Sequence, residues 1–436
     1  MSDALRLGVL VLAFGAGTAS AQDFGPDPVF TPLNEASVNL GHLLFYDPIL
    51  SGNRNISCAT CHHPTFGTGD GVSLSLGEGG IGLGPDRVAD PDNLPEQRIP
   101  RNAPALWNLG AEEFTVMFHD GRLEADPDEP NGIRTPLGDD MVQGFKSVLA
   151  AQAMFPVLSG DEMAGHYSEN EVSQAVRLGH LSIEGGAWDR ISARLEAIPA
   201  YRWAFDDVIG TGTPIRFADI GNALADFISF EWRADNSPFD HYLREGTPLP
   251  DDAERGRVQF YGDAGCAACH SGWFQTDHDF HAIAMPQLGP GKAARFEIHA
   301  RDEGRGRVTG DAADAYRFRT PSLRNVALTG PFGHSGAYAT LEGVVRHHLD
   351  PVASLNSYDP TRAILPMLDG AKDLRVVENA ADTRQIALAN GLQPVALSEA
   401  EIADLLAFLN ALTDEDAVKG RLGIPETVPS GLRVER

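Results

Sequence analysis

The sequence lacks two features that would place the protein in a membrane or on a nucleic acid. No apolar run reaches the roughly 18 residues that a membrane-spanning helix requires. Positive charge is scarce, because 34 lysines and arginines face 61 aspartates and glutamates, which leaves a net charge of −27 over 436 residues. Such a surface repels nucleic acids and anionic lipids. We therefore expect neither a membrane span nor a nucleic-acid partner.

The first 21 residues have the pattern of a secretory signal peptide. Leu7 to Phe14 is a short apolar core, and Ala19-Ser20-Ala21 is a small-residue cleavage site. The basic region before the core is thin, and an ordinary buried N-terminal helix is the alternative. We predict that residues 1–21 are removed on export and that the mature protein is periplasmic.

Cysteine is scarce too, and the spacing of the four cysteines defines their role. Four cysteines in an exported protein would ordinarily suggest two disulfides. Here every cysteine belongs to a C-x-x-C-H motif, the attachment pattern of c-type haem, in which two thiols bind the haem vinyl groups. The following histidine is the proximal iron ligand. A zinc site would not need a histidine directly after both pairs. We predict two covalently bound haem c groups, attached at Cys58, Cys61 and His62 and at Cys266, Cys269 and His270.

The segments after the two haem motifs repeat each other. Residues 101–108, RNAPALWN, parallel residues 319–325, RTPSLRN, and FHDG at 118–121 parallels FGHSG at 332–336. We interpret this repeat as an internal duplication. The predicted fold is mainly α, with two cytochrome c-like haem domains at 22–245 and 246–436 and long irregular loops.

Hydrophobic spacing predicts several of the elements. We expect helices at 217–230 and 254–260, a turn at 236–239, and a linker at Glu245–Asp252. Ser398 and Glu401 form a capping box before a terminal helix whose apolar stripe is core packing. Residues 77–100 and 351–394 are rich in glycine and proline, and we expect loops there.

Six ordered blocks resemble the bacterial diheme cytochrome c peroxidase family, which includes the MauG-type protein-oxidising enzymes. The resemblance runs from about Leu40 to the end and weakens within 170–217 and 351–394. It implies that the N-terminal haem reacts with hydrogen peroxide, that the C-terminal haem transfers electrons, and that calcium lies between the domains. The matching blocks are LGHLLFYDPILSGNRNISCATCH, PRNAPALWN, FHDGR, AAQAMFPVLSGDEMAG, RGRVQFYGDAGCAACHSG and TPSLRNVALTGPFGHSGAYATLEGVVRHH.

The family's site residues transfer by motif. In AAQAMFPVLSGDEM the distal glutamine corresponds to Gln152 and the catalytic glutamate to Glu162. A carboxylate beside the open iron face can move a proton between the two peroxide oxygens. The resemblance also implies calcium ligation by Asn102 and by the backbone carbonyls of Thr329 and Pro331, and oxygen ligands suit calcium.

The first departure from the family is on the distal side of the first haem. Many members carry a removable distal histidine in an S-x-G-H-G loop, and Glu78 stands at that position here. A carboxylate is a weak ligand for haem iron, so we expect an open site that needs no reductive activation, as in MauG-type members. His63 is the local alternative ligand, but it follows His62 directly and should point away.

The second departure concerns the ligand of the second haem. The family places methionine or, in MauG-type members, tyrosine fourteen residues after the H-x-G histidine. From His334 this position is His348, so we predict ligation by His270 and His348 and a lowered haem potential. Met367 and His347 are the rival ligands.

A third departure lies between the haems. His119 replaces the tryptophan of the family's FWDGR segment, and Trp107 is near it in sequence. The sequence alone assigns neither residue a role.

The leading hypothesis is therefore an exported diheme peroxidase-like oxidoreductase. Its electrons come either from a small cytochrome c or cupredoxin, or from a residue on a protein substrate, and the departures favour the second version. The acidic surface would attract a basic partner, although the charge also serves solubility. The alternative is a non-enzymatic diheme electron-transfer cytochrome, in which Glu162 is inert.

Overall fold

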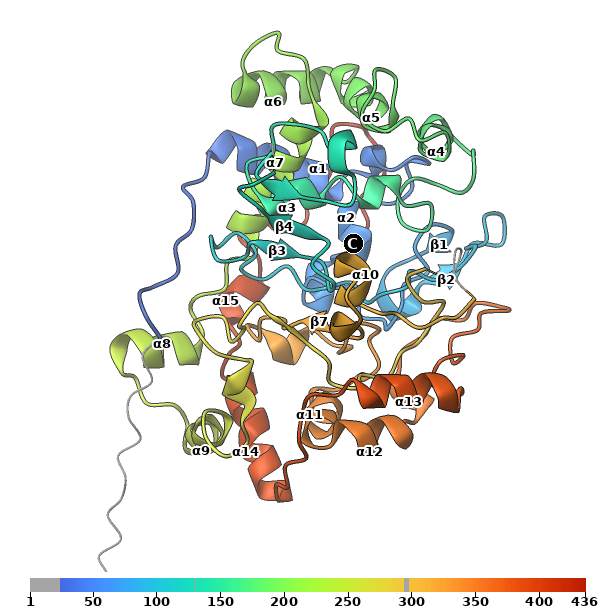
Figure 1. Ribbon diagram of the computed structural model, residues 1–436. Coiled ribbons are helices and arrows are strands. Elements are labelled where there is room, and N and C mark those ends of the chain that lie inside the picture. Colours follow the sequence, from blue (N-terminus) through green and yellow to red (C-terminus); the bar gives the residue numbers. More distant parts are fainter. Residues whose placement is uncertain (1–23, 130, 294–297) are drawn as a thin grey trace, which may run out of the picture.

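The computed structural model describes residues 24–129, 131–293 and 298–436, so the predicted signal peptide lies outside the described residues (Figure 1). Within the described residues no helix is long and apolar enough to cross a membrane. The protein is mainly helical. The α-helices are α1 (Glu35–Tyr46), α2 (Cys58–Cys61), α3 (Val148–Gln152), α4 (Glu171–Arg177), α5 (Ala187–Glu196), α6 (Pro199–Ile209), α7 (Phe217–Glu231), α8 (Pro238–Glu245), α9 (Asp251–Phe260), α10 (Arg305–Thr309), α11 (Leu341–Leu349), α12 (Pro351–Asn356), α13 (Ala380–Leu388), α14 (Glu399–Asn410) and α15 (Glu415–Val418).

Short 3-10 helices and three small antiparallel sheets fill the connections. The strand orders are β1-β2, β3-β4-β5 and β6-β7. The strands are β1 (Gly80–Ile81), β2 (Val88–Ala89), β3 (Val116–Met117), β4 (Leu123–Ala125), β5 (Ile133–Arg134), β6 (Phe280–His281) and β7 (Phe318–Arg319). The 3-10 helices are η1 (Pro48–Leu50), η2 (Pro64–Phe66), η3 (Gly84–Asp86), η4 (Gly138–Asp140), η5 (Pro156–Leu158), η6 (Cys266–Ala268), η7 (Ala312–Asp314), η8 (Val326–Leu328) and η9 (Pro360–Arg362).

The first haem motif follows a helix that packs closely against α7. The helix predicted at 217–230 is observed as α7, and α1 lies across it. At the crossing a Cβ on Gly41 would overlap the carbonyl oxygen of Ala223, so only glycine lets the two backbones approach this closely. Phe45, one turn later, is buried between Phe227 and Trp232. The chain leaves α1 and reaches the haem motif in α2.

The second haem motif follows a similar helix pair, α9 and α14 (lower left of Figure 1). A Cβ on Gly256 would overlap the carbonyl oxygen of Asp404, and Phe260, one turn later, packs on Phe408. The predicted capping box at Ser398 and Glu401 is confirmed at the start of α14. Both halves thus deliver their haem motif from a helix with the pattern Gly-x-x-x-Phe at its crossing point.

Some expectations about local structure were wrong. The turn expected at 236–239 is the start of α8, because Ser237 caps the helix and Pro238 occupies its first position. The loop expected at 351–394 contains α12 and α13, which have little signal in the sequence because few of their residues are buried and they show little helical periodicity. Of the linker expected at Glu245–Asp252, residues 246–250 join α8 to α9, whereas Glu245 ends α8 and Asp251 and Asp252 begin α9.

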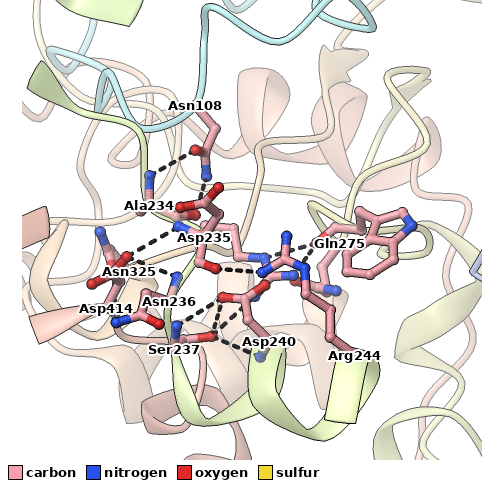
Figure 2. A network of polar contacts seen from close by, with 12 residues as sticks. Asn108, Ala234, Asp235, Asn236, Ser237, Asp240, Arg244, Gln275, Asn325 and Asp414 are labelled. Carbon is pink, nitrogen blue, oxygen red and sulfur yellow. Dashed lines mark hydrogen bonds and ion pairs between the residues drawn. The ribbon is translucent and has the colours of Figure 1, made fainter. Parts of the chain in front are cut away.

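The C-terminal segment returns to the first half, and a polar network holds it where it turns. The side chain of Asp414 accepts hydrogen bonds from the backbone N–H groups of Asp235 and Asn236, and the backbone N–H of Asp414 donates to the side-chain oxygen of Asn325 (Figure 2). Further on, Ser430 donates to Asp47 in the first half. The chain then ends beside α2 (Figure 1).

Buried ion pairs also join the two halves. Arg101 of the first half contacts Asp302 of the second at 2.6 Å and Asp120 at 2.6 Å. Arg98 pairs with Asp373 at 2.9 Å. These side chains are almost completely enclosed, so the halves form one body with a polar seam.

Candidate haem-binding and catalytic sites

The first haem motif presents a histidine that is held by backbone carbonyls. The Nδ1–H of His62 donates to the carbonyl of Thr68 at 3.0 Å, and the backbone of Pro104 also interacts with the ring. The hydrogen bond at Nδ1 makes Nε2 the nitrogen that would bind a metal. Burial lowers the pKa of His62, so the ring is neutral, as a ligand must be. Cys58 and Cys61 are the first and last residues of α2, a single helical turn with Ser57 at its N-cap position. The arrangement fits c-type haem attachment.

The second haem motif repeats this geometry. Cys266 begins η6, and the Nδ1–H of His270 donates to the carbonyl of Gln275 at 3.0 Å. The pKa of His270 is lowered to about 4, first by burial and then by the charge of His348. A backbone acceptor that orients a ligating imidazole is the usual partner in metal sites.

His348 of α11 lies opposite His270. The two rings are 6.4 Å apart between centroids, and the Nδ1–H of His348 donates to the carbonyl of Val344 at 2.8 Å, so its Nε2 is also free. Two metal–nitrogen bonds of about 2.1 Å plus two ring radii of about 1.1 Å span about 6.4 Å, which is the separation of two imidazoles on one metal ion. The donor pair therefore fits a haem iron between the rings.

The two rival ligands are placed elsewhere. His347 is fully buried, but its Nε2–H donates to the carbonyl of Ile283 at 2.8 Å and its Nδ1 accepts from Tyr338 at 3.0 Å. Both ring nitrogens are therefore engaged. Met367 is 84% exposed. Neither side chain is positioned like His348.

The candidate catalytic residues Gln152 and Glu162 lie at the end of α3 and in the loop after η5. The Glu162 loop is held from two sides, because the N–H of Gly52 donates to the carbonyl of Met163 at 2.7 Å and a Cβ on Gly77 would overlap the carbonyl oxygen of Asp161. The side-chain oxygen of Gln152 is buried and has no hydrogen-bond partner among the described residues. An unpaired buried acceptor is costly unless a bound molecule completes it.

Glu162 lies within electrostatic range of the first haem motif. The pKa of the Cys61 thiol is raised to about 12, first by burial and also by nearby carboxylates that include Glu162. Two cationic residues that the sequence did not predict to be functional, Arg122 and Lys292, lie in the same region. Arg122 stacks on the ring of Phe118 at 3.5 Å, and burial lowers the pKa of Lys292, which the charge of Glu162 partly opposes. Arg122 is the last residue of the FHDGR block, so a sequence motif pointed to it, whereas Lys292 belongs to no motif that was recognised in the sequence.

The substituted residue Glu78 is buried on the loop between α2 and β1. Its Oε1 accepts hydrogen bonds from the side-chain amides of Asn53, Asn55 and Asn93. Its Oε2 is buried without a hydrogen-bond partner among the described residues. His63, the local alternative ligand, accepts a hydrogen bond at Nδ1 from the N–H of Thr65.

The calcium candidates come from two segments that the fold brings together. The N–H of Asn102 donates to the carbonyl of His334 at 2.8 Å, close in sequence to Pro331. A Cβ on Gly67 of the first half would overlap the carbonyl oxygen of Leu328, which neighbours Thr329. The Nδ2 of Asn102 donates to the carbonyl of Val72 at 2.9 Å. Carbonyl oxygens are suitable ligands for calcium. Calcium binding by these residues stays a prediction.

His119 and Trp107, which lie between the two haem motifs in the sequence, differ in their hydrogen bonding. The Nε2–H of His119 donates to the carbonyl of Asn102 at 3.0 Å, and the pKa of His119 is lowered to about 4, mainly by burial. Trp107 is buried, and its Nε1–H has no partner among the described residues. Leu106 donates its N–H to the hydroxyl of Thr68, whose carbonyl orients His62, so the Trp107 segment contacts the proximal side of the first motif.

One other cluster within the described residues has the composition of a metal site. Cys269, Asp277 and His281 lie within 4.8 Å of one another. Because Cys269 belongs to the second haem motif, we interpret the 2.8 Å pair of His281 and Asp277 as a neighbour of the haem rather than a separate metal centre.

Comparisons with known proteins identify the family of this chain. Residues 35–247 match the family model described as di-haem cytochrome c peroxidase. The methylamine utilization protein MauG of Methylorubrum extorquens is 30% identical over 400 residues, which cover 90% of this chain and 82% of that protein. The cytochrome c551 peroxidase of Pseudomonas aeruginosa is 29% identical, covering 79% and 84%. A crystal structure of a MauG-like protein associated with microbial copper homeostasis superposes with a TM-score of 0.57 at 26% identity, covering 92% and 97%.

The chain belongs to the di-haem cytochrome c peroxidase and MauG family. It is accordingly an oxidoreductase of the diheme peroxidase type, with haem as its cofactor.

Proposed function

We propose that the protein is an exported, peroxide-driven enzyme whose first haem is open on its distal side. The observation that carries the proposal is the position of Glu162, on a loop clamped by Gly52 and Gly77 and within electrostatic reach of Cys61. A glutamate without a functional role usually lies on the protein surface, where its carboxylate is exposed to solvent.

The haem at His62 supplies the redox chemistry of peroxide cleavage. The chain's own residues supply the proton transfers. Glu162 takes a proton from the nearer peroxide oxygen and returns it to the farther one, which leaves as water. The unpaired side-chain oxygen of Gln152 accepts a hydrogen bond from the bound peroxide and orients it. Arg122 and Lys292 are the cations within electrostatic range of Glu162.

Cys266, Cys269, His270 and His348 would hold the second haem, which would supply electron transfer to the first. Two imidazoles give it a lower potential than the methionine ligand of many relatives would. A low-potential partner haem shares an oxidising equivalent more readily. We therefore favour oxidation of a residue on a partner protein over oxidation of a small cytochrome c or cupredoxin.

Three further features belong to this proposal. The haems are attached covalently, calcium binds at Asn102, Thr329 and Pro331, and the two halves derive from an internal duplication. The glycine crossings at Gly41 and Gly256 support the duplication. Export to the periplasm is inferred from the signal-peptide pattern of residues 1–21 and from the proposed covalent attachment of haem.

The test is low-temperature EPR spectroscopy of the ferric protein before and after one equivalent of hydrogen peroxide, without reductant. We expect one high-spin and one low-spin haem, and loss of the high-spin signal on peroxide addition. Glu162→Gln should slow that loss by about 10²- to 10⁴-fold, or about 2.7 to 5.5 kcal/mol, the usual contribution of acid–base catalysis. The exposed Glu112→Gln is the matched control. Two low-spin haems that ignore peroxide would instead indicate an electron-transfer cytochrome.

A further inference from the structure

The carboxylate of Glu78 is held by three amides. The side chain is 1% exposed, and its Oε1 accepts hydrogen bonds from Asn53 at 3.1 Å, Asn55 at 2.8 Å and Asn93 at 2.9 Å. Hydrogen bonds to an ionised acceptor are among the stronger ones in proteins. Three donors on one buried oxygen therefore fix the side chain in a single orientation.

Two of the three amides are themselves held in place. The Nδ2 of Asn53 also donates to Glu169 at 2.7 Å, and its Oδ1 accepts from Asn170 at 2.9 Å. The Oδ1 of Asn93 accepts from the Nδ1–H of His166 at 3.0 Å. Because these outer contacts fix which end of each amide is the donor, Glu78 meets a preorganised set of N–H groups.

The backbone of Glu78 is joined to the loop of the candidate catalytic residue. The N–H of Glu78 donates to the carbonyl of Asp161 at 2.9 Å, directly before Glu162. Gly77 has a φ of +59°, and a Cβ there would overlap the same carbonyl oxygen. The two loops are thus in backbone contact, so a displacement of the Glu78 loop would move Glu162.

A second group holds the Glu78 loop from the other side. The buried Arg87 donates to the carbonyls of Gly77 at 2.9 Å and Gly82 at 2.6 Å. Glu435 lies 4.0 Å from Arg87 and accepts a hydrogen bond from Thr60, inside the first haem motif. The C-terminal segment thereby connects this loop to the haem attachment turn.

We propose that Glu78 is a positioning residue that locks the Ser75–Gly82 loop and, through Asp161, fixes Glu162 over the first haem. Its carboxylate is a structural anchor, neither an iron ligand nor a proton carrier. Where relatives carry a histidine that must leave the iron, this chain has a side chain tied to Asn53, Asn55 and Asn93. The inference rests on the proposed reaction of the first haem with peroxide.

Substitutions of Glu78 can distinguish a structural anchor from an iron ligand and from a proton carrier. Gln retains an acceptor oxygen for the three amides, and its amide nitrogen takes the place of Oε2, which has no partner among the described residues. Glu78→Gln should therefore preserve the lock, whereas Glu78→Ala removes it. A ligand or a proton carrier would be lost in both variants, because a neutral amide neither titrates nor binds ferric iron as a carboxylate does.

The experiment compares Glu78→Ala, Glu78→Gln and Asn55→Ala in the haem-loaded protein. Asn55→Ala removes the shortest of the three bonds and keeps the test available if Glu78→Ala does not fold. Asp382→Asn is the control, because it loosens a comparably buried carboxylate, paired with Arg301, in the second half. The readouts are hydrogen–deuterium exchange of residues 75–82 and 159–164, ferric EPR, and the rate of peroxide reaction.

We expect Glu78→Ala to react with peroxide about 10- to 100-fold more slowly, the usual loss when a supporting contact of a metal site is removed. Exchange should increase in both peptides, while the low-spin haem is unchanged. Asn55→Ala should show the same changes to a smaller degree, Glu78→Gln should retain most of the rate, and Asp382→Asn should match the wild type.

Two results would overturn the inference. If Glu78→Gln lost as much rate as Glu78→Ala, or changed the high-spin signal, the carboxylate would be acting at the iron or on protons. If Glu78→Ala left exchange at 159–164 unaltered, the two loops would not be coupled. Both results presuppose a wild-type protein that reacts with peroxide, so a wild type that did not react would refute the proposed function instead.

Discussion

Replacement of His348 tests the proposed ligation of the second haem most directly. His348→Ala should convert that haem from low-spin to high-spin, because the imidazole 6.4 Å from His270 is removed and neither rival ligand, His347 or Met367, is placed to substitute. Since the protein is proposed to hold two haems, half of the total haem should change spin state. The first haem should keep its high-spin signal and its reaction with peroxide.

Two matched variants separate ligation from general damage. His347→Ala removes a buried ring with hydrogen bonds to Ile283 and Tyr338, and should lower the free energy of unfolding by about 1–3 kcal/mol without changing the spin state. Met367→Ala alters a side chain that is 84% exposed and should change neither property. Low-temperature EPR measures the spin state, and denaturant unfolding of the same samples measures stability.

Added imidazole extends the test. A ring lost from a preformed site can be replaced from solution, so imidazole should restore the low-spin signal of His348→Ala. The assignment would be refuted if His348→Ala stayed low-spin without imidazole, or if Met367→Ala became high-spin. In the second case Met367 would have to leave its exposed position to reach the iron.

Three further predictions concern stability. Asp302→Asn should cost about 1–3 kcal/mol in denaturant unfolding, because Arg101 keeps Asp120 as a carboxylate partner but loses Asp302; a cost well below about 1 kcal/mol would show that the seam is not stabilised by this pair. Gly256→Ala should destabilise by at least about 1–3 kcal/mol in the same assay, since its Cβ would overlap the carbonyl of Asp404, and no loss would contradict the close crossing. Burial raises the pKa of Asp70 to about 7, so the folded state keeps a proton that the unfolded state releases near pH 4. Stability should therefore fall between pH 4 and 7 by up to about 1.4 kcal/mol per pH unit, and Asp70→Asn should remove that slope in unfolding measured across this range.

Local features of the sequence were sufficient for the haem motifs and the main helices. The cysteines and histidine of C-x-x-C-H lie within five residues, so their geometry is set by one turn of chain, as at His62 and His270. The helix α7 has strong helical periodicity, and Ser398 marks the start of α14 by a local hydrogen-bond pattern. Such features depend on neighbours in sequence and can be predicted from it.

The rest of the site depends on contacts between distant residues. Asn53 and Asn93 are ordinary loop residues in sequence, and only the fold brings both amides to Glu78. Glu435 reaches Thr60 across most of the chain length. Lys292 lies near Glu162 with no motif around it. Periodicity and spacing contain no signal for these pairings.

The two halves deliver their haem motifs alike but cover the opposite side differently. In the second half a regular helix, α11, carries His348, and the bond from its Nδ1–H to Val344 one turn earlier aims Nε2 toward His270. In the first half the loops of Glu78 and Glu162 lie near Cys61 instead, and they are in backbone contact with each other through Gly77 and Asp161. A helix can present a strong iron ligand, whereas anchored loops can hold a carboxylate near the iron without binding it. This difference between a helix that carries a histidine and two anchored loops that carry carboxylates supports the proposed division into an electron-transfer haem and a peroxide-reactive haem.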